Sequence, residues 1–78
     1  MAELARVRLG LDELEAMRLC DLDGLEQEAA GTCMGVSRGT VQRLLQTGRV
    51  AVLRALITSS ALVIEGDELD ASLSADRA

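Results

Sequence analysis

The chain has 78 residues with 13 acidic and 8 basic side chains, so its net charge is −5. This length allows a single domain with a small core, and the chain has no aromatic residue to fill it. Histidine and lysine are also absent, which removes the usual bases that activate a Ser or Cys nucleophile. We therefore expect no enzymatic activity.

The location of the protein follows from its hydrophobicity pattern. No apolar run approaches the ~20 residues of a membrane-spanning helix, and the first residues lack the basic and apolar regions of a signal peptide. The sequence therefore predicts a cytoplasmic protein that does not enter a membrane.

The first predicted elements are a strand and a helix. Residues 5–9 alternate polar and apolar side chains, which is typical of a short strand, and Gly10 ends it. Residues 11–22 form the first predicted helix, in which three early acids favour the positive end of the helix dipole. Gly24 is suited to a left-handed C-terminal cap. The apolar face of this helix is expected to carry Leu11, Leu14, Met17 and Leu22.

Two further helices follow. The second is predicted from residue 26 to residue 33 or 34, and Gly35 fits a turn that needs a positive φ angle. Ser37 is a good N-cap for a third helix, which we expect to span residues 38–57. Gly48 predicts fraying or a bend in this helix, because glycine costs up to ~1 kcal/mol relative to alanine there.

The chain ends in a strand and an acidic tail. Residues 61–65 are rich in β-branched side chains and predict a short strand. This strand pairs either with residues 7–9 of the same chain or with a second copy. Residues 67–78 are acidic and short of large apolar side chains, which predicts a disordered tail. Residues 1–66 are therefore expected to form the one folded domain.

Charge is distributed along the chain in three blocks. Residues 31–64 hold four arginines and no acid, whereas residues 1–30 carry a net −5 and residues 65–78 a net −4. A positive segment between two negative ones says little about the fold and much about the partners. It favours a negatively charged partner for the middle of the chain.

A helix-turn-helix pattern lies in this positive segment. In such a motif two helices pack closely at a fixed angle, and the second helix enters the major groove of DNA. Numbered from Gln27, the pattern needs a small residue at the helix crossing, which is Gly31, and a turn glycine, which is Gly35. Its apolar positions are filled by Ala30, Met34, Val36, Val41 and Leu44. A plain helical hairpin with a glycine turn is the alternative.

Several short motifs carry a family resemblance. They are LDELEAMRL at residues 11–19, DLDGL at 21–25, QE at 27–28, MGVSR at 34–38, RLL at 43–45, Arg49, and LVIEG at 62–66. Over about residues 7–66 the chain resembles a prokaryotic family of predicted DNA-binding proteins. This family is domain of unknown function 134, or uncharacterised protein family 0251. The resemblance implies a mainly α, three-helix helix-turn-helix domain with short N- and C-terminal strands. It also implies a motif similar to region 4 of sigma-70 factors, and a presumed transcriptional regulator.

The chain departs from this family at several positions. It lacks the family's Cys/Arg-rich beginning, and Glu26 stands where the family tends to have a capping serine. Gly31 and Thr32 replace an alanine and a charged residue. Val50 and Ala51 replace two lysines that would contact phosphates, which predicts weaker DNA binding.

The predicted DNA contacts lie on the third helix, because the N-terminal half of a recognition helix faces the bases. Arg38 and Arg43 suit guanine, and Gln42 suits adenine. Arg49 and, with less weight, Arg54 suit the DNA backbone. The predicted DNA-binding residues are Ser37, Arg38, Gly39, Thr40, Gln42, Arg43, Gln46 and Arg49. The inward side is expected to carry Val41, Leu44 and Leu45. The alternative for each arginine is a solvated helix face.

The end of the third helix carries a second signal. Its apolar side chains are more numerous than one side of a small monomer needs: Val50, Val52, Leu53, Leu56 and Ile57. They either pack within the chain or form the interface of a homodimer. Dimers are common among small domains that have no disulfide or metal.

Two functions stay open: a DNA-binding transcriptional regulator, and a module that binds a protein such as a component of the transcription machinery. A further hypothesis is that residues 65–76 fold over the arginines and compete with double-stranded DNA.

The two cysteines, Cys20 and Cys33, cannot complete a four-ligand zinc site in a chain without histidine. We expect both to be reduced and largely buried, because free cysteine behaves as a small apolar residue. A disulfide or a metal site shared between chains is the alternative. The sequence predicts no metal and no cofactor.

Overall fold

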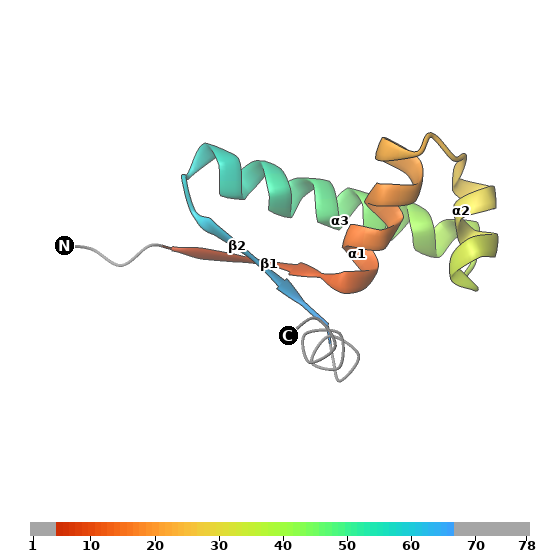
Figure 1. The fold of residues 1–78 in the computed structure, drawn as a ribbon, viewed down its shortest axis with the longest axis horizontal. Coiled ribbons are helices and arrows are strands. Elements are labelled where there is room, and N and C mark those ends of the chain that lie inside the picture. Colours follow the sequence, from red (N-terminus) through yellow and green to blue (C-terminus); the bar gives the residue numbers. More distant parts are fainter. Residues whose placement is uncertain (1–4, 67–78) are drawn as a thin grey trace, which may run out of the picture.

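The computed structural model of the chain describes residues 5–66 and is mainly helical (Figure 1). Its elements are β1 (Arg6–Gly10), α1 (Leu11–Met17), the π-helical turn η1 (Arg18–Leu22), α2 (Gln27–Met34), α3 (Arg38–Ile57) and β2 (Ala61–Glu65). The long helix α3 runs along the molecule, with α2 at one end and the two strands along the other. The predicted acidic tail lies outside the described residues.

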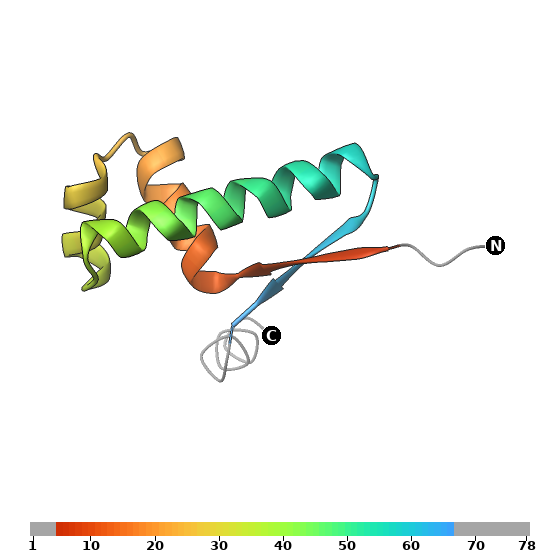
Figure 2. The same cartoon turned by 180° about the vertical axis from the view of Figure 1, so that it is seen from behind.

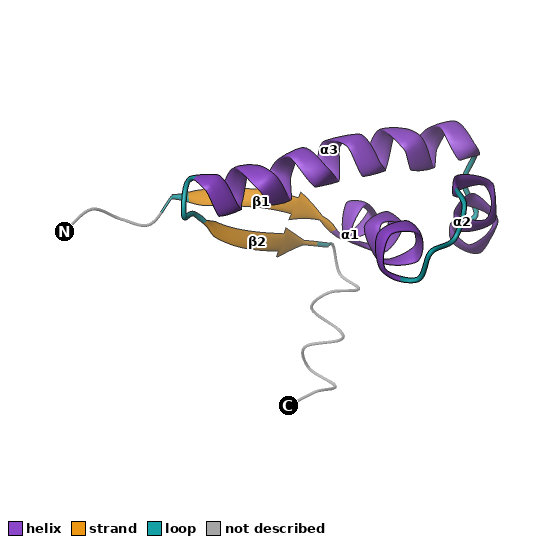
Figure 3. Cartoon of the chain, turned by 90° about the horizontal axis from the view of Figure 1, so that it is seen from above, coloured by secondary structure: helices purple, strands orange, loops and turns teal. Residues whose placement is uncertain are grey.

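The two strands form a parallel ladder within the chain, which decides between the two pairings that the sequence allowed. Val7 pairs with Leu62 and Leu9 with Ile64, so these four side chains share one face of the sheet. Helix α3 lies over β1 rather than β2, as the view from above shows (Figure 3). Leu9 is therefore buried, whereas Leu62 and Ile64 remain partly exposed.

The first predicted helix exists but changes type along its length. Residues 11–17 are α-helical, and residues 18–22 form a π-helical turn in which Asp23 N donates to Arg18 O at 2.9 Å. The expected apolar face was wrong for Leu22, which is 78% exposed. A π turn takes more residues than an α turn and rotates the following side chains away from the α-helical stripe. Gly24 follows this segment and takes a φ of +82°, which confirms the left-handed conformation predicted for it.

The core lies where α1, η1, α2 and the first half of α3 meet. Its buried side chains are Ala16, Leu19, Ala30, Val41 and Leu45. Val41 and Leu45 thus take the inward positions that the sequence predicted, and Leu44 is half-buried against the same cluster. Ala16 and Leu19 are the most buried residues of α1 and η1, whereas three of the four predicted residues, Leu11, Leu14 and Met17, are half-buried. Met17 packs against the core cluster.

Helices α2 and α3 meet at Gly31, the predicted crossing residue. A Cβ atom at Gly31 would lie 2.7 Å from the backbone oxygen of Val36, so a larger residue here requires the backbone of the turn to shift. Gly35 takes a φ of +73°, and Val36 N donates to Gly31 O at 2.9 Å. The side chain of Val36, predicted as an apolar motif position, is exposed. Val36 contributes its backbone, which closes the turn, rather than its side chain.

Gly48 plays a role that the sequence did not predict. Helix α3 continues through Gly48 to Ile57, so the predicted fraying or bend is not found (Figure 2). Gly48 is buried against α1, where a Cβ atom would lie 2.9 Å from Met17 Sδ and 3.2 Å from Glu13 Cβ. The glycine allows α1 to cross closely over α3. Glu13 also accepts hydrogen bonds from Gly10 N and Thr47 Oγ1, and thereby ties this crossing to β1.

Both cysteines are free, as predicted, but their predicted burial was wrong for Cys33. Cys20 is half-buried against the core, whereas Cys33 is exposed on α2. The side of α2 that faces the core carries Ala30, Gly31 and the partly buried Met34, and Cys33 lies about 110° around the helix from the centre of that side.

Candidate nucleic-acid interface

Helix α3 begins with a side-chain cap at Ser37. Ser37 Oγ accepts a hydrogen bond from Thr40 N at 3.1 Å and donates to Thr40 Oγ1 at 3.0 Å. The cap satisfies one of the orphan N–H groups of the first turn, as the sequence predicted. The hydroxyls of Ser37 and Thr40, predicted as phosphate contacts, are thus already engaged with each other.

We expect Ser37→Ala to destabilise the domain by about 1 kcal/mol, because the first turn of α3 loses its cap. Ser37→Asp is the matched control, since aspartate caps as well as serine and should leave the melting temperature nearly unchanged. Thermal unfolding followed by circular dichroism measures both. Equal stability of the alanine and aspartate variants would contradict the role assigned to this cap.

The outward side of α3 gathers the residues predicted to read DNA. Arg38, Gly39, Gln42, Arg43 and Gln46 are all exposed in the first half of the helix. At about 100° per residue, Arg38 and Gln42 lie along one line of the helix and Arg43 lies to one side of it. Neither arginine forms an ion pair with any residue between 5 and 66. Both guanidinium groups are therefore available to a partner on this part of the surface.

Arg49 differs from these arginines because Asp21 holds it. Arg49 Nη2 donates to Asp21 Oδ1 at 2.7 Å, and Arg49 Nε donates to Asp21 Oδ2 at 3.1 Å. The hydrogen bonds lower the pKa of Asp21 and raise that of Arg49, since each charge stabilises the other. The contact joins η1 to α3 across 28 residues of sequence. Sequence reasoning missed Asp21, because nothing in the local pattern links it to α3.

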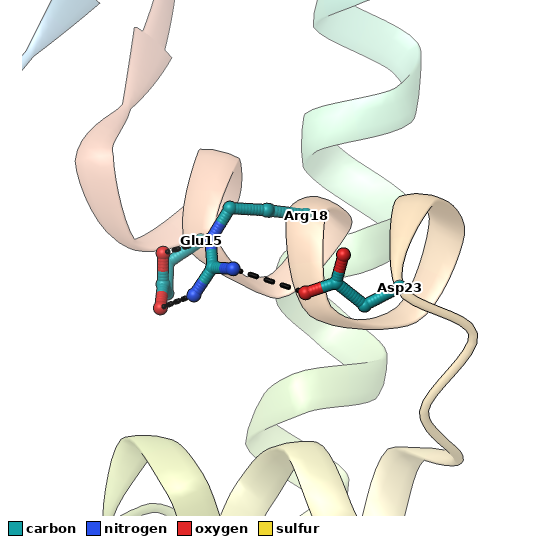
Figure 4. Close-up of polar contacts among 3 residues, drawn as sticks. All are labelled: Glu15, Arg18 and Asp23. Carbon is teal, nitrogen blue, oxygen red and sulfur yellow. Dashed lines mark hydrogen bonds and ion pairs between the residues drawn. The ribbon is translucent and has the colours of Figure 1, made fainter.

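Arg18 is likewise engaged within the fold (Figure 4). Its guanidinium donates to both carboxylate oxygens of Glu15, at 3.0 and 2.7 Å, and to Asp23 Oδ2 at 3.0 Å. The hydrogen bonds from Arg18 lower the pKa of Glu15. This cluster on α1 and η1 pairs its positive charge with two acids, so it adds no free cation to the outward side of α3.

The second half of α3 has a different surface. Four apolar side chains there are between 50% and 74% exposed; we call them the apolar stripe: Val50, Leu53, Leu56 and Ile57. Val52, predicted with them, is half-buried, and Ala55 takes the inward position. Arg54 is exposed beside the stripe. The outward side of α3 thus changes from polar and cationic to apolar at Val50, where the sequence resemblance placed a missing lysine.

Neither a metal site nor a membrane span occurs in the described part of the chain. Between residues 5 and 66, no three Asp, Glu, Cys or His side chains gather closely enough to hold a metal ion. None of the described helices has the length and apolar character needed to cross a membrane.

Comparison with known proteins places the chain in a family. The model of the family described as "Protein of unknown function DUF134" matches residues 1–72. A UPF0251 protein of Desulforudis audaxviator is 46% identical over 67 residues, which cover 86% of the chain and 44% of that protein. A UPF0251 protein of Pelotomaculum thermopropionicum is 48% identical over 66 residues, which cover 85% of the chain and 50% of that protein.

A third relative is matched over more of its length. The UPF0251 protein of Aeromonas salmonicida is 40% identical over 72 residues, which cover 92% of the chain and 71% of that protein. The chain spans about half the length of most of these relatives. No solved structure matches the chain. The family match and the extent of the shared sequence together show that the chain belongs to the DUF134 family.

Proposed function

We propose that the protein binds specific sequences of double-stranded DNA through a helix-turn-helix formed by α2 and α3, and that it acts as a transcriptional regulator. The observation that carries this proposal is the outward side of α3. There, Arg38, Gln42 and Arg43 are exposed on a helix without a single acid, and both arginines lack an ion-pair partner among residues 5–66.

The packing of α2 against α3 supports the same proposal. A helix-turn-helix needs two helices at a fixed angle and a tight turn between them. Gly31 at the crossing, Gly35 in the turn and Ser37 at the start of α3 meet these needs. The resemblance of the motif to region 4 of sigma-70 factors is consistent with this role. In the proposed complex, Arg38 or Arg43 binds guanine O6 and N7, and Gln42 binds adenine N6 and N7.

We expect the natural chain to enrich a defined sequence from a pool of random duplex DNA, and Arg38→Ala/Arg43→Ala to enrich none. Each bidentate base contact discriminates by about 1–3 kcal/mol, so the loss of two should remove sequence preference. The selection is run at low and moderate salt, because phosphate contacts weaken as salt rises. The control is Arg6→Ala, which removes an exposed arginine of β1 and should leave the enriched sequence unchanged.

The result that contradicts the proposal is equally clear. If the folded natural chain retains no DNA at about 50 mM salt, where a few phosphate contacts still register, it does not bind DNA by itself. Enrichment of the same sequence by the double variant would place the reading surface elsewhere in the molecule.

We propose a protein-interaction module as the second candidate, because the apolar stripe of α3 is exposed. Such a stripe on one straight helix can pack against the same stripe of a second copy or against a helix of another protein. The net charge of −5 and the absence of lysine are consistent with this candidate. A lack of DNA retention in the selection described above would favour it over the first.

A further inference from the structure

Arg49 lies on the same side of α3 as Arg38 and Gln42, two of the residues proposed to read bases. It follows Arg38 by 11 residues, which at about 100° per residue is three turns and about 20°. Along the helix axis the two positions are separated by roughly 17 Å, at about 1.5 Å per residue. With Arg38 over the bases, Arg49 lies beyond the N-terminal half of α3 that reads them, where contacts to the DNA backbone are expected.

Asp21 binds the group that Arg49 would offer to a phosphate. Both oxygens of the Asp21 carboxylate accept hydrogen bonds from one edge of the guanidinium, formed by Nε and Nη2. Arginine uses this same fork for bidentate contacts with phosphate oxygens. One edge cannot hold a carboxylate and a phosphate together, and the Asp21 charge also repels an approaching phosphate.

We infer that Asp21 is an affinity-determining residue of the DNA interface, because its carboxylate occupies Arg49 and competes with a backbone phosphate. This inference rests on the proposed DNA binding. The side chains of both Arg49 and Asp21 are exposed to solvent, and exposed ion pairs contribute little free energy. Asp21 therefore lowers the fraction of Arg49 that is free to bind a phosphate, and this reduces the affinity for DNA.

The test compares Asp21→Asn with Asp23→Asn. Each variant removes one negative charge. Asp21 lies in η1, and Asp23 lies two residues later, at the C-terminal cap of η1. Asp23, however, pairs with Arg18 rather than with Arg49. Binding is measured by fluorescence anisotropy of a labelled duplex that carries the enriched sequence, over a series of salt concentrations. Arg49→Gln and the double variant Asp21→Asn/Arg49→Gln complete a double-mutant cycle.

We expect Asp21→Asn to tighten binding about two- to fivefold at low salt, a range set by the weakness of exposed pairs. Its affinity should also fall more steeply with salt, because Arg49 then neutralises one more phosphate, which steepens the logarithmic slope by up to about 0.9. Asp23→Asn should leave the slope unchanged. In the Arg49→Gln background, Asp21→Asn should have no effect beyond that of Asp23→Asn.

Three results would overturn the inference, and they differ in whether the proposed DNA binding remains. Asp21→Asn and Asp23→Asn could tighten DNA binding equally, or the effect of Asp21→Asn could persist in the Arg49→Gln background. Either result would show that Asp21 acts only through its negative charge and not through Arg49. DNA binding itself would then remain. Absence of binding by the natural chain and all four variants, with native circular dichroism, would remove the proposed function and this inference with it.

Discussion

Gly31→Ala is expected to lower the stability of the domain by about 1–3 kcal/mol, the range for adding a methyl group to a tightly packed site. The new Cβ would lie 2.7 Å from Val36 O, 3.4 Å from Ser37 C and 3.5 Å from Arg38 N. All three atoms belong to the backbone of the turn, so no side chain can rotate to make room. The turn itself, or the whole of α2, has to move.

Gly39→Ala is the matched control for this prediction. It places the same methyl group in α3, where the nearest atom that it meets is Ser37 Oγ at 3.9 Å. Replacement of a helical glycine by alanine stabilises by up to ~1 kcal/mol. Thermal unfolding should therefore show opposite shifts, each of several degrees, since 1 kcal/mol moves the melting temperature of such a domain by about 4–8 °C. Similar shifts for both variants would show that α2 and α3 are not packed as closely as described.

Leu45→Ala is expected to have the largest effect of any single substitution proposed. Leu45 is 1% exposed and belongs to the core cluster with Ala16, Leu19, Ala30 and Val41. Removal of a buried leucine side chain costs about 2–5 kcal/mol. The core of a domain this small rarely supplies more than about 3–5 kcal/mol of net stability. A large part of the Leu45→Ala population should therefore be unfolded at 25 °C, as measured by circular dichroism and urea titration.

Leu53→Ala provides the comparison within the same helix. Leu53 is exposed in the apolar stripe, so its replacement by alanine should change the stability of a monomer by no more than about 0.5 kcal/mol. Destabilisation of equal size at the two positions would mean that the apolar stripe is covered in solution. The experiment therefore tests the core and the exposure of the stripe together.

The sequence was informative wherever a local rule acts alone. Capping preferences predicted Ser37 as the N-cap and the span of α3. The conformational freedom of glycine predicted the positive φ angles of Gly24 and Gly35. The inward positions of Val41 and Leu45 follow from the 3.6-residue period. The exposed position of Arg43 follows from the same period, which places it on the side of α3 away from Val41 and Leu45, whereas Gln42 lies about 60° from Leu45 around the helix. Arg38 lies nearly in line with Leu45 and is exposed at the first residue of the helix.

Other features depended on contacts between distant segments. The π turn at η1 shifted the buried face from Leu22 to Leu19, and local helix preference does not encode such a shift. The low helix propensity of Gly48 predicted fraying or a bend in α3. In the structure, Gly48 lies where α1 crosses closely over α3. Propensity describes an isolated helix, whereas the crossing depends on what packs against it.

The family, the order of the elements and the helix that carries the exposed arginines were all readable from the sequence, because capping, periodicity and the absence of acids are properties of neighbouring residues. Three features were not: the strands pair in parallel within one chain, Gly48 serves a crossing, and Asp21 holds Arg49. Each of them joins residues that are 28 or more positions apart. Their geometry is set by how the whole chain packs, which no local pattern of residues specifies.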